Sequence, residues 1–173
     1  SIDVGSGILD INLAKFAEVN NIKNFEFYSG IPGSIGGAVK MNAGCFGFET
    51  KDIIQEIQLI NNKGELINYS KEQINFGYRK SNLPINSIVI SAKYDFFYGY
   101  KEEIQINIKK IKEMRENSQP IKLKTSGSTF KNPKNNFAAK LIEQTGCKGL
   151  RIGDAIVSEK HANFLINLNK ASS

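Results

Sequence analysis

Two short segments of the sequence combine residue types that could carry chemistry, and the first is rich in glycine. Between Gly30 and Gly37, four glycines and a serine surround one proline, so several backbone N–H groups could converge on an anion. The segment is neither a P-loop nor a GxGxxG dinucleotide fingerprint. By itself it fits a sharp structural turn at least as well as a phosphate site. The small residues Asn42-Ala43-Gly44 that follow would suit the packing of a flat cofactor against backbone.

The second segment, residues 126–133, places hydroxyl groups next to a cation and an amide. Ser128 is followed closely by Lys131 and Asn132. A nucleophilic hydroxyl needs a histidine or lysine base, and the sole histidine, His161, has no acidic residue in an obvious orienting place. A hydrolase triad is therefore poorly supported. Donation of a proton by Ser128 to a forming carbanion fits better, because neighbouring positive charge favours the alkoxide left behind.

Three further residue types, an arginine, a histidine and two cysteines, are candidates for chemistry. Arg79, after Tyr78, carries a fixed charge that can bind and polarise a carboxylate through two parallel hydrogen bonds, although an exposed arginine would look the same. His161 alone is typical of a capped turn or a packed imidazole. Since Cys45 and Cys147 are remote from each other, we expect two reduced thiols, no disulfide framework and no metal site.

The elements that must position these groups follow from hydrophobic periodicity and turn residues. We predict a turn-rich loop system over residues 30–44, helices over 11–20, 101–117 and 138–144, a hairpin formed by 53–60 and 65–69, and a β-rich run over 85–97. Residues 152–156 and 162–167 should flank a turn at 158–161. Helix and strand mix without regular alternation, which predicts the α+β class. The helix over 101–117 should end before Gln119-Pro120, because a residue before proline avoids the helical region. We expect a second lobe to begin at about this point.

Composition sets limits on the partners of the chain. Its 173 residues are 40% hydrophobic and 23% charged, as in soluble globular proteins. No apolar run is long enough to span a membrane and no signal peptide is evident, so we expect a cytoplasmic protein. The net charge of +6 favours anionic partners without choosing among them. A non-catalytic anion-binding or nucleic-acid-binding fragment therefore stays open at this level.

Six motifs in order resemble the UDP-N-acetylenolpyruvoylglucosamine reductase family, also called UDP-N-acetylmuramate dehydrogenases. They are Gly30-Ile31-Pro32-Gly33-Ser34-Ile35-Gly36-Gly37-Ala38, Met41-Asn42-Ala43-Gly44, Tyr78-Arg79, Gln119-Pro120, Gly127-Ser128-Thr129-Phe130-Lys131-Asn132-Pro133 and Ser158-Glu159-Lys160-His161-Ala162-Asn163-Phe164. The short distance from Arg79 to Ser128 is similar to the form of the family that lacks an extra tyrosine-bearing loop. The resemblance implies an incomplete FAD-binding domain of the vanillyl-alcohol-oxidase type over residues 1–98 and a smaller α+β substrate-binding domain over 99–173.

The resemblance also implies a function: a bacterial enzyme of peptidoglycan synthesis, serving cell shape and cell division. It would carry FAD and use NADPH to reduce the enolpyruvyl ether of UDP-N-acetylglucosamine. Arg79 would polarise the substrate carboxylate, and Ser128 would protonate the carbanion. The implied FAD contacts are Ser29, Gly30, Pro32, Gly33, Ser34, Gly36, Gly37, Asn42, Ala43 and Gly44. The implied contacts to the UDP-sugar are Tyr78, Arg115, Asn132 and His161. A monomer without metal, nucleic-acid or membrane partners is expected.

Two features of the family are not matched by this sequence. Members begin with a further glycine-rich FAD segment of the form Gly-Gly-Gly-Ser-Asn, and they end with a helix and a strand carrying a glutamate that works with the arginine. We therefore expect a fragment whose own FAD binding and turnover are open. The alternatives are another FAD-binding oxidoreductase or the non-catalytic anion-binding fragment.

Overall fold

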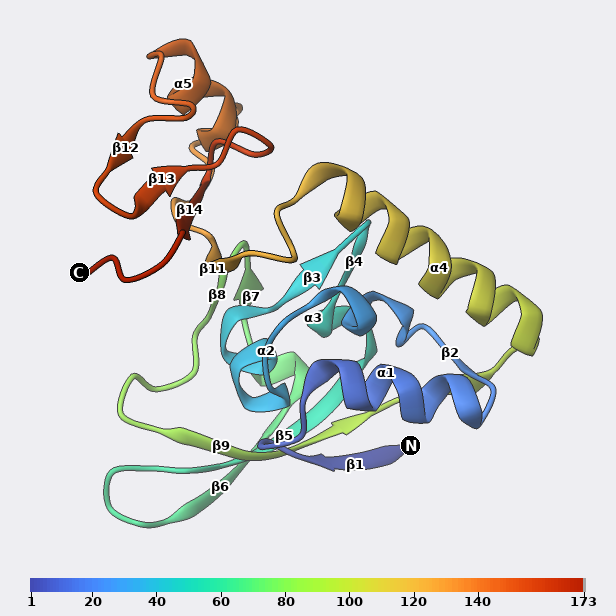
Figure 1. Ribbon diagram of the computed structural model, residues 1–173. Helices are drawn as coiled ribbons and strands as arrows, with labels where there is room; N and C mark the ends of the chain where they lie inside the picture. Colours follow the sequence, from blue (N-terminus) through green and yellow to red (C-terminus); the bar gives the residue numbers. More distant parts are fainter. Residues whose placement is uncertain (173) are drawn as a thin grey trace. The chain divides into compact units, whose positions relative to one another are not determined.

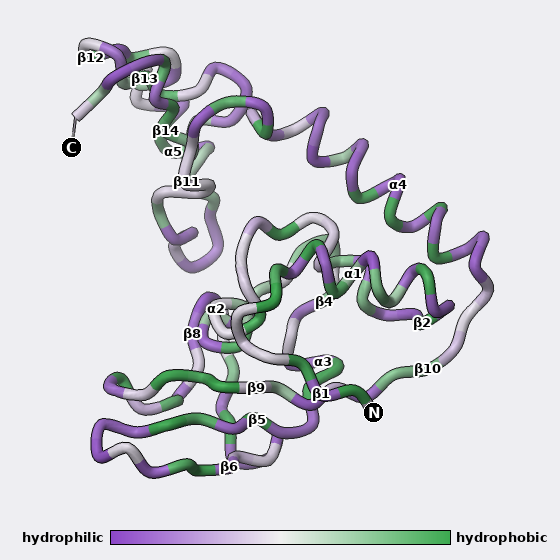
Figure 2. Tube along the Cα trace, turned by 60° about the horizontal axis from the view of Figure 1, so that its bottom comes forward, coloured by the Kyte–Doolittle hydropathy of each residue, from purple (hydrophilic) through white to green (hydrophobic). Residues whose placement is uncertain are grey.

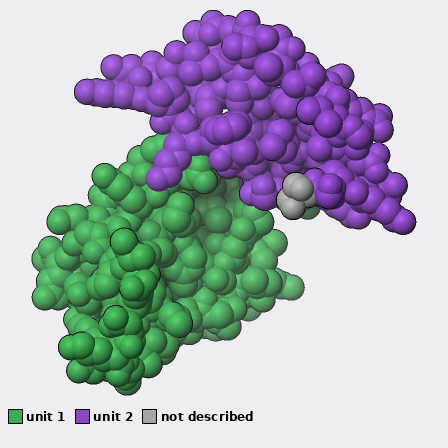
Figure 3. Space-filling view, turned by 90° about the vertical axis from the view of Figure 1, so that its left-hand side faces the viewer, with its two compact units in different colours: residues 1–112 green, residues 113–173 purple. Residues whose placement is uncertain are grey.

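The computed structural model describes residues 1–172 and divides the chain into two compact units (Figures 1 and 3). Unit 1 is Ser1–Lys112, and unit 2 begins at Glu113. The division falls inside helix α4 (Lys101–Ser118), further along the chain than the boundary expected between residues 98 and 99. The first turns of α4 belong to unit 1, and Gln105 Nε2 in them donates a hydrogen bond to Glu18 Oε1 at 3.1 Å.

Unit 1 is built on a four-stranded antiparallel sheet with the order β1-β9-β5-β6. Its strands are β1 (Ile2–Gly5), β5 (Ile54–Ile60), β6 (Leu66–Ser70) and β9 (Ile88–Tyr94). The predicted hairpin is confirmed, since β5 and β6 pair from Glu56 opposite Ser70 to Ile60 opposite Leu66. Gly64 in the connecting turn has a φ of 81°, which glycine adopts without a steric penalty.

An irregularity in β5 explains which of its side chains face the core. The register with β9 shifts between Ile54 and Glu56, so one extra residue enters β5. Ile54 and Ile57 are consequently both buried although they are three positions apart, which in a regular strand would place them on opposite faces. Leu59, two positions further, resumes the alternation. Figure 2 shows the resulting hydrophobic stretches along β5 and β9.

Helix α1 (Asp10–Val19) agrees with the helix predicted over residues 11–20. Its buried residues, Asp10, Leu13, Ala14 and Ala17, recur at the spacing of one helix face. This face packs against the 3-10 helix η1 (Glu26–Gly30), which buries aromatic side chains in the same core. The core of unit 1 therefore lies between the sheet and these two elements.

Helix α2 (Ile35–Met41) departs from the turn-rich loop system predicted over residues 30–44. The glycines argued against a helix there, but α2 buries an apolar face against β9. A Cβ added to Gly36 would lie 3.0 Å from Ser6 Cβ, so the missing side chain lets the helix approach the turn that follows β1. Tertiary packing thus outweighs the low helix propensity of glycine.

The other elements of unit 1 are short. They are β2 (Ile22–Lys23), β3 (Gly44–Cys45), β4 (Phe48–Glu49), α3 (Thr50–Ile53), η2 (Lys71–Gln73), β7 (Phe76–Gly77), β8 (Lys80–Ser81) and β10 (Phe97–Tyr98). The β-rich run predicted over 85–97 therefore forms two strands in different sheets, because β9 joins the main sheet whereas β10 pairs with β2. Helix α4 matches the prediction for 101–117 and is mainly hydrophilic, with recurring apolar patches (Figure 2).

Unit 2 carries a second antiparallel sheet with the order β11-β14-β13-β12. Its elements are β11 (Lys124–Ser128), α5 (Ala138–Gln144), β12 (Arg151–Ile152), β13 (Ala155–Val157) and β14 (Phe164–Asn167). Helix α5 and its termination at Gly146, with a φ of 73°, are as predicted. Gly153, with a φ of 55°, turns the chain between β12 and β13, which pair as a hairpin.

Gly44 supplies a test of the packing around the β3–β4 hairpin. A Cβ at Gly44 would lie 2.4 Å from Phe48 O, whereas nothing lies within 4 Å of one at Gly5. We expect Gly44→Ala to lower the free energy of unfolding by about 2 kcal/mol and Gly5→Ala to change it by less than about 1 kcal/mol. Urea unfolding followed by circular dichroism measures both, and equal effects would contradict the close approach.

Candidate functional site

In the glycine segment, residues 30–37, some backbone groups are hydrogen-bonded within the fold and others are available to a ligand. The N–H of Ile35 donates to Ile8 O and that of Gly36 to Ser6 O, both at 2.9 Å. Gly33 O accepts from the N–H of Asp10. Among residues 1–172, no backbone partner is recorded for the N–H groups of Gly33, Ser34 and Gly37. These three donors, rather than the whole segment, can receive anionic or carbonyl oxygen atoms of a ligand.

The predicted cofactor contacts differ in accessibility. Pro32, Gly33 and Gly37 are exposed, and Ser34 is half-buried, so this face is open to a ligand. The remaining members are less accessible: Gly30 is buried, Gly36 is pressed against Ser6, and the Ser29 hydroxyl donates to Glu26 O at 2.6 Å. The turn at Gly33 and Ser34 is therefore the exposed part of the predicted cofactor surface.

Asp10 lies directly beneath this turn and was not predicted as a functional residue. Its side chain is fully buried, and neither carboxyl oxygen has a hydrogen-bond partner among the described residues. Oδ2 lies 2.9 Å from the position that a Cβ on Gly33 would occupy, so any side chain at residue 33 would require this carboxyl group to shift. Burial raises the pKa of Asp10 to about 7, because removing a carboxylate from water disfavours its charged form.

The Asn42-Ala43-Gly44 segment is held from inside the protein. Asn42 is buried with a φ of 46°; its Nδ2 donates to Glu49 Oε2 at 3.0 Å, and its Oδ1 accepts from the N–H of Lys51. Hydrogen bonds from Lys51 and Asn42 hold the pKa of Glu49 below its ordinary value. The carbonyl of Ala43 accepts from both the hydroxyl and the N–H of Thr50, each at 2.9 Å. The Asn42 side chain is thus a structural group, and only backbone is left for a ligand.

Arg79 occupies the second loop position between β7 and β8, where its φ is 51°. A residue with a Cβ pays roughly 1–2 kcal/mol in this left-handed region. Its half-buried guanidinium has no hydrogen bond or ion pair among residues 1–172, so it is available to an anionic ligand. Tyr78 beside it is 54% exposed. The two residues predicted to meet the substrate therefore project from one hairpin loop.

Ser128 owes its direction to a bulge in β11. Thr125 pairs with Ile166 and Ser128 with Phe164, so three steps along β11 match two along β14. Gly127, with a φ of 86°, provides the extra residue. Ser128 is exposed, and its hydroxyl has no partner among the described residues. A free hydroxyl aimed by a bulge is what a proton donor requires.

His161 lies next to the same strand position. Its ring packs edge to face on Phe164, with centroids 4.8 Å apart, and Phe164 is the cross-strand neighbour of Ser128. The N–H of Asn163 donates to Nδ1 at 3.3 Å, and burial lowers the imidazole pKa. The neutral ring therefore carries its proton on Nε2, where it can donate to a ligand. The structure thus brings Ser128 and His161 to one end of the second sheet.

Asn163 joins the two halves of this site. Its Oδ1 accepts from the N–H of Phe130, its Nδ2 donates to Phe130 O, and its own carbonyl accepts from the N–H of Thr129. It is 4% exposed. The position of the chain after Ser128 is thereby tied to the turn that carries His161. The backbone N–H of His161 in turn donates to the buried hydroxyl of Ser158, at 3.2 Å.

The other two predicted substrate contacts have structural partners. Asn132 Oδ1 accepts from the N–H of Ala138, in the first turn of α5, at 3.0 Å. Arg115 Nε donates to Gln119 Oε1 at 3.0 Å, just beyond the end of α4.

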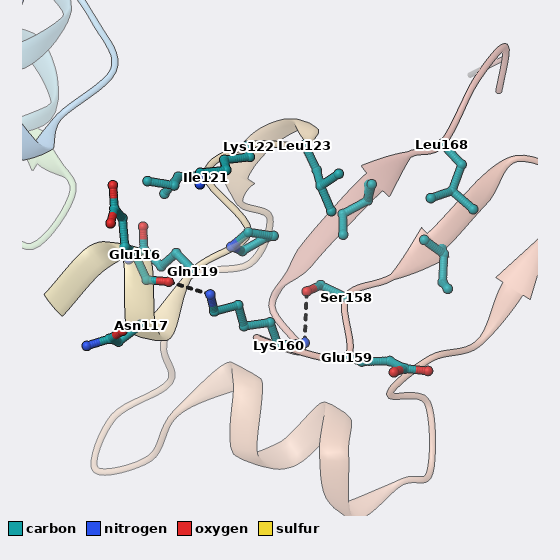
Figure 4. Close-up of a pocket in the computed structure, with 13 residues that line it drawn as sticks. Glu116, Asn117, Gln119, Ile121, Lys122, Leu123, Ser158, Glu159, Lys160 and Leu168 are labelled. Atoms are coloured by element: carbon teal, nitrogen blue, oxygen red, sulfur yellow. Dashed lines mark hydrogen bonds between the residues drawn. The ribbon is translucent and has the colours of Figure 1, made fainter. Parts of the chain in front are cut away.

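A hollow of about 610 Å³ lies elsewhere in unit 2 (Figure 4). Its apolar lining comes from Ile121, Leu123, Ile156, Ile166 and Leu168. Lys160 Nζ crosses it to donate to the carbonyl of Glu116. None of the four predicted site residues of unit 2 lines this hollow, so it is separate from the site around Ser128.

Comparison with known proteins assigns both units. Residues 1–70 match the model of an FAD binding domain, and residues 119–173 match the UDP-N-acetylenolpyruvoylglucosamine reductase, C-terminal domain. The chain is 46% identical over 98% of its length to the UDP-N-acetylenolpyruvoylglucosamine reductase of Rickettsia conorii, and 45% identical over its full length to that of Gluconobacter oxydans. The chain belongs to the UDP-N-acetylenolpyruvoylglucosamine reductase family. It spans 58% and 56%, respectively, of the length of these curated relatives.

A solved structure supports the same family. UDP-N-acetylenolpyruvylglucosamine reductase from Thermus caldophilus superposes with a TM-score of 0.91 and 39% sequence identity, over 98% of this chain and 63% of that one. The predicted family and the α+β class are confirmed. The comparisons do not favour a different flavin oxidoreductase or a nucleic-acid-binding fragment. Over residues 1–172, no helix is long and apolar enough to cross a membrane, and no cluster of three metal-ligating side chains occurs.

Sequence reasoning missed two residues that shape the site, Asp10 and Asn163. Asp10 stands at a helix start, where acidic residues are common on the surface, so nothing in the sequence marked it as buried. Asn163 lies inside a quoted family motif, which was the only available signal. Its bonding to residues 129 and 130 follows from the pairing of β11 with β14 and is a tertiary feature.

The buried Asp10 predicts a pH-dependent cost to stability. Its pKa is about 7 in the folded chain against an ordinary 3.8, so its contribution to stability is present below pH 3.8 and lost as the pH rises to 7. Asp10→Asn should therefore gain stability relative to the wild type between these values, by up to about 4 kcal/mol. Urea unfolding from pH 4 to pH 8 measures the gain. Asp3→Asn, at an exposed position of β1, is the control, and a pH-independent gain would contradict the assignment.

The left-handed backbone of Arg79 predicts an order of stability among variants. Arg79→Gly removes the Cβ and relieves the strain, whereas Arg79→Ala removes the guanidinium and keeps the strain. We expect the glycine variant to be more stable than the alanine variant by about 1 kcal/mol, measured by thermal unfolding. An alanine variant as stable as the glycine variant would show that the loop adopts another conformation.

Proposed function

We propose that the chain is part of an enzyme that reduces UDP-N-acetylglucosamine enolpyruvate to UDP-N-acetylmuramate with NADPH and FAD. The observation that carries the proposal is the exposed Ser128 hydroxyl, fixed by a bulge beside His161, in a chain of this family. When bound, FAD supplies the transfer of a hydride from NADPH to the methylene carbon of the enolpyruvyl group. The residues of the chain bind, polarise and protonate.

Arg79 acts on the substrate carboxylate. As the methylene carbon gains a hydride, the electron pair of the double bond moves to the adjacent carbon and spreads onto its carboxylate. A guanidinium bound to both carboxylate oxygens stabilises this charge more as it grows, which lowers the barrier. Ser128 Oγ–H then donates the proton that completes the new C–H bond. Tyr78, on the same loop as Arg79, contacts the substrate.

Groups of unit 2 bind the diphosphate of the substrate. We assign His161 Nε2–H and the Asn132 amide to it, with Arg115 supplying positive charge. In unit 1, the three unused N–H groups at Gly33, Ser34 and Gly37 fit oxygen atoms of FAD, together with exposed backbone of the Asn42-Ala43-Gly44 segment. Residues 1–98 thus serve FAD, with Tyr78 and Arg79 contributing to the substrate site, and residues 99–173 serve the substrate. We further propose a monomer acting in the cytoplasm in peptidoglycan synthesis, because a UDP-sugar and NADPH are both soluble reactants.

Ser128→Ala tests the assignment of the proton donor, with Ser126→Ala, at an exposed position of the same strand, as the control. We expect Ser128→Ala to lower kcat by at least about 100-fold while reduction of bound FAD by NADPH is unchanged, because only the protonation step is lost. Stopped-flow absorbance of the flavin separates the two steps. Equal kcat values for the two variants would contradict the role of Ser128.

The chain itself is tested by adding FAD to the purified protein and recording the flavin absorbance. A retained flavin band and NADPH oxidation that depends on the enolpyruvyl substrate support the proposal. Salt-sensitive binding of nucleic acid with no retained flavin would support the non-catalytic alternative instead.

A further inference from the structure

Lys40, in the last turn of α2, holds the chain that follows the Arg79 hairpin. Its ammonium donates to Leu83 O at 2.8 Å and to Pro84 O at 2.9 Å. Its own carbonyl accepts from the Ser81 hydroxyl at 2.8 Å. One residue therefore binds three successive points after the loop, and an ammonium with several donors suits this geometry better than a neutral side chain.

Asn42 holds the other side of the same hairpin. Its Nδ2 lies 3.3 Å from Gly77 O and donates to it, immediately before the loop. Strands β7 and β8 have two residues each and form a separate two-stranded sheet. Because so short a hairpin is marginal by itself, its place depends on these ties to α2.

The position of the Arg79 side chain depends on how firmly the β7–β8 hairpin is held. Its backbone stays in the left-handed region, with a φ of 51°, only if the surroundings hold it there. Its guanidinium has no partner among residues 1–172 that could position it independently. The direction of the charge is therefore set by the backbone of the loop.

We propose that Lys40 is a positioning residue for Arg79, through its hydrogen bonds with Ser81, Leu83 and Pro84. The inference rests on the proposed function, in which Arg79 binds the substrate carboxylate. It adds that the helix following the glycine segment and the carboxylate-binding loop are joined by one side chain. Lys40 touches neither substrate nor cofactor in this role.

Lys40→Met removes the donors and keeps the length of the side chain, and Lys40→Arg keeps donors. Lys63→Met, in the exposed β5–β6 turn, is the matched control. Binding of UDP-N-acetylglucosamine enolpyruvate and of UDP-N-acetylglucosamine, which lacks the carboxylate, is measured for each by calorimetry. Arg79→Gln defines complete loss of the carboxylate contact.

The preference is the ratio of the dissociation constants of the two ligands. We expect Lys40→Met to lower this preference for the carboxylate-bearing ligand about tenfold, as Arg79→Gln does, while the affinity for UDP-N-acetylglucosamine is unchanged. Lys40→Arg and Lys63→Met should keep the preference. A general structural role would weaken both ligands equally, and that result, or a preference retained in Lys40→Met, would overturn the proposal.

If neither nucleotide binds the wild-type chain, the proposed function fails, and hydrogen exchange then decides the role of Lys40. In Lys40→Met, the amides of Gly77 and Lys80 should exchange about tenfold faster than in Lys63→Met, with the β5 and β9 amides unchanged. Equal exchange at Gly77 and Lys80 in the two variants would overturn the inference.

Discussion

A chain of buried hydroxyl groups anchors the site loops of unit 1 to its sheet. The Tyr94 and Tyr28 hydroxyls lie 3.2 Å apart, Tyr28 donates to Thr50 Oγ1 at 3.1 Å, and Thr50 donates to Ala43 O. All three side chains are fully buried, so each hydroxyl needs its neighbour as a partner. Burial raises the pKa of both tyrosines, which therefore remain protonated donors. The backbone at Ala43, and with it the end of α2, cannot move without breaking this chain.

From that anchored helix end, the constraints extend in two directions. Toward its start, α2 approaches Ser6 through Gly36 and leaves the Gly33 turn exposed above the buried Asp10. Beyond its end, Lys40 and Asn42 bind the hairpin that carries Arg79. The same short helix thus fixes the backbone proposed to hold FAD and the cation proposed to hold the substrate. A protein can keep a strained arginine and an unpaired carboxyl in such a place because the surrounding packing determines their positions.

In unit 2, an irregular strand rather than a helix positions the candidate catalytic residue. A plain β11–β14 ladder would place Ser128 opposite Asn163, whereas the bulge at Gly127 places it opposite Phe164, against which His161 packs. The side chain of Asn163 then binds both the N–H and the carbonyl of Phe130, two residues after Ser128. Glycine is needed at 127 for its backbone conformation, with a φ of 86°, and nothing lies close enough to exclude a Cβ on grounds of space.

The sequence by itself determined the family, through the order of six motifs, and that resemblance assigned roles to Arg79 and His161. The α+β class, helices α1, α4 and α5, and the β5–β6 hairpin followed from local periodicity and turn residues, which specify them without distant partners. Ser128 was singled out by its hydroxyl next to a cation and an amide. Only the tertiary structure decided that Gly36 lies in a helix, that Gly153 lies in the turn of a hairpin, and that the side chain of Asn42 supports the fold. It alone decided that Asp10 is buried without a partner. Each of these depends on contacts between residues far apart in the chain, and no local pattern encodes them.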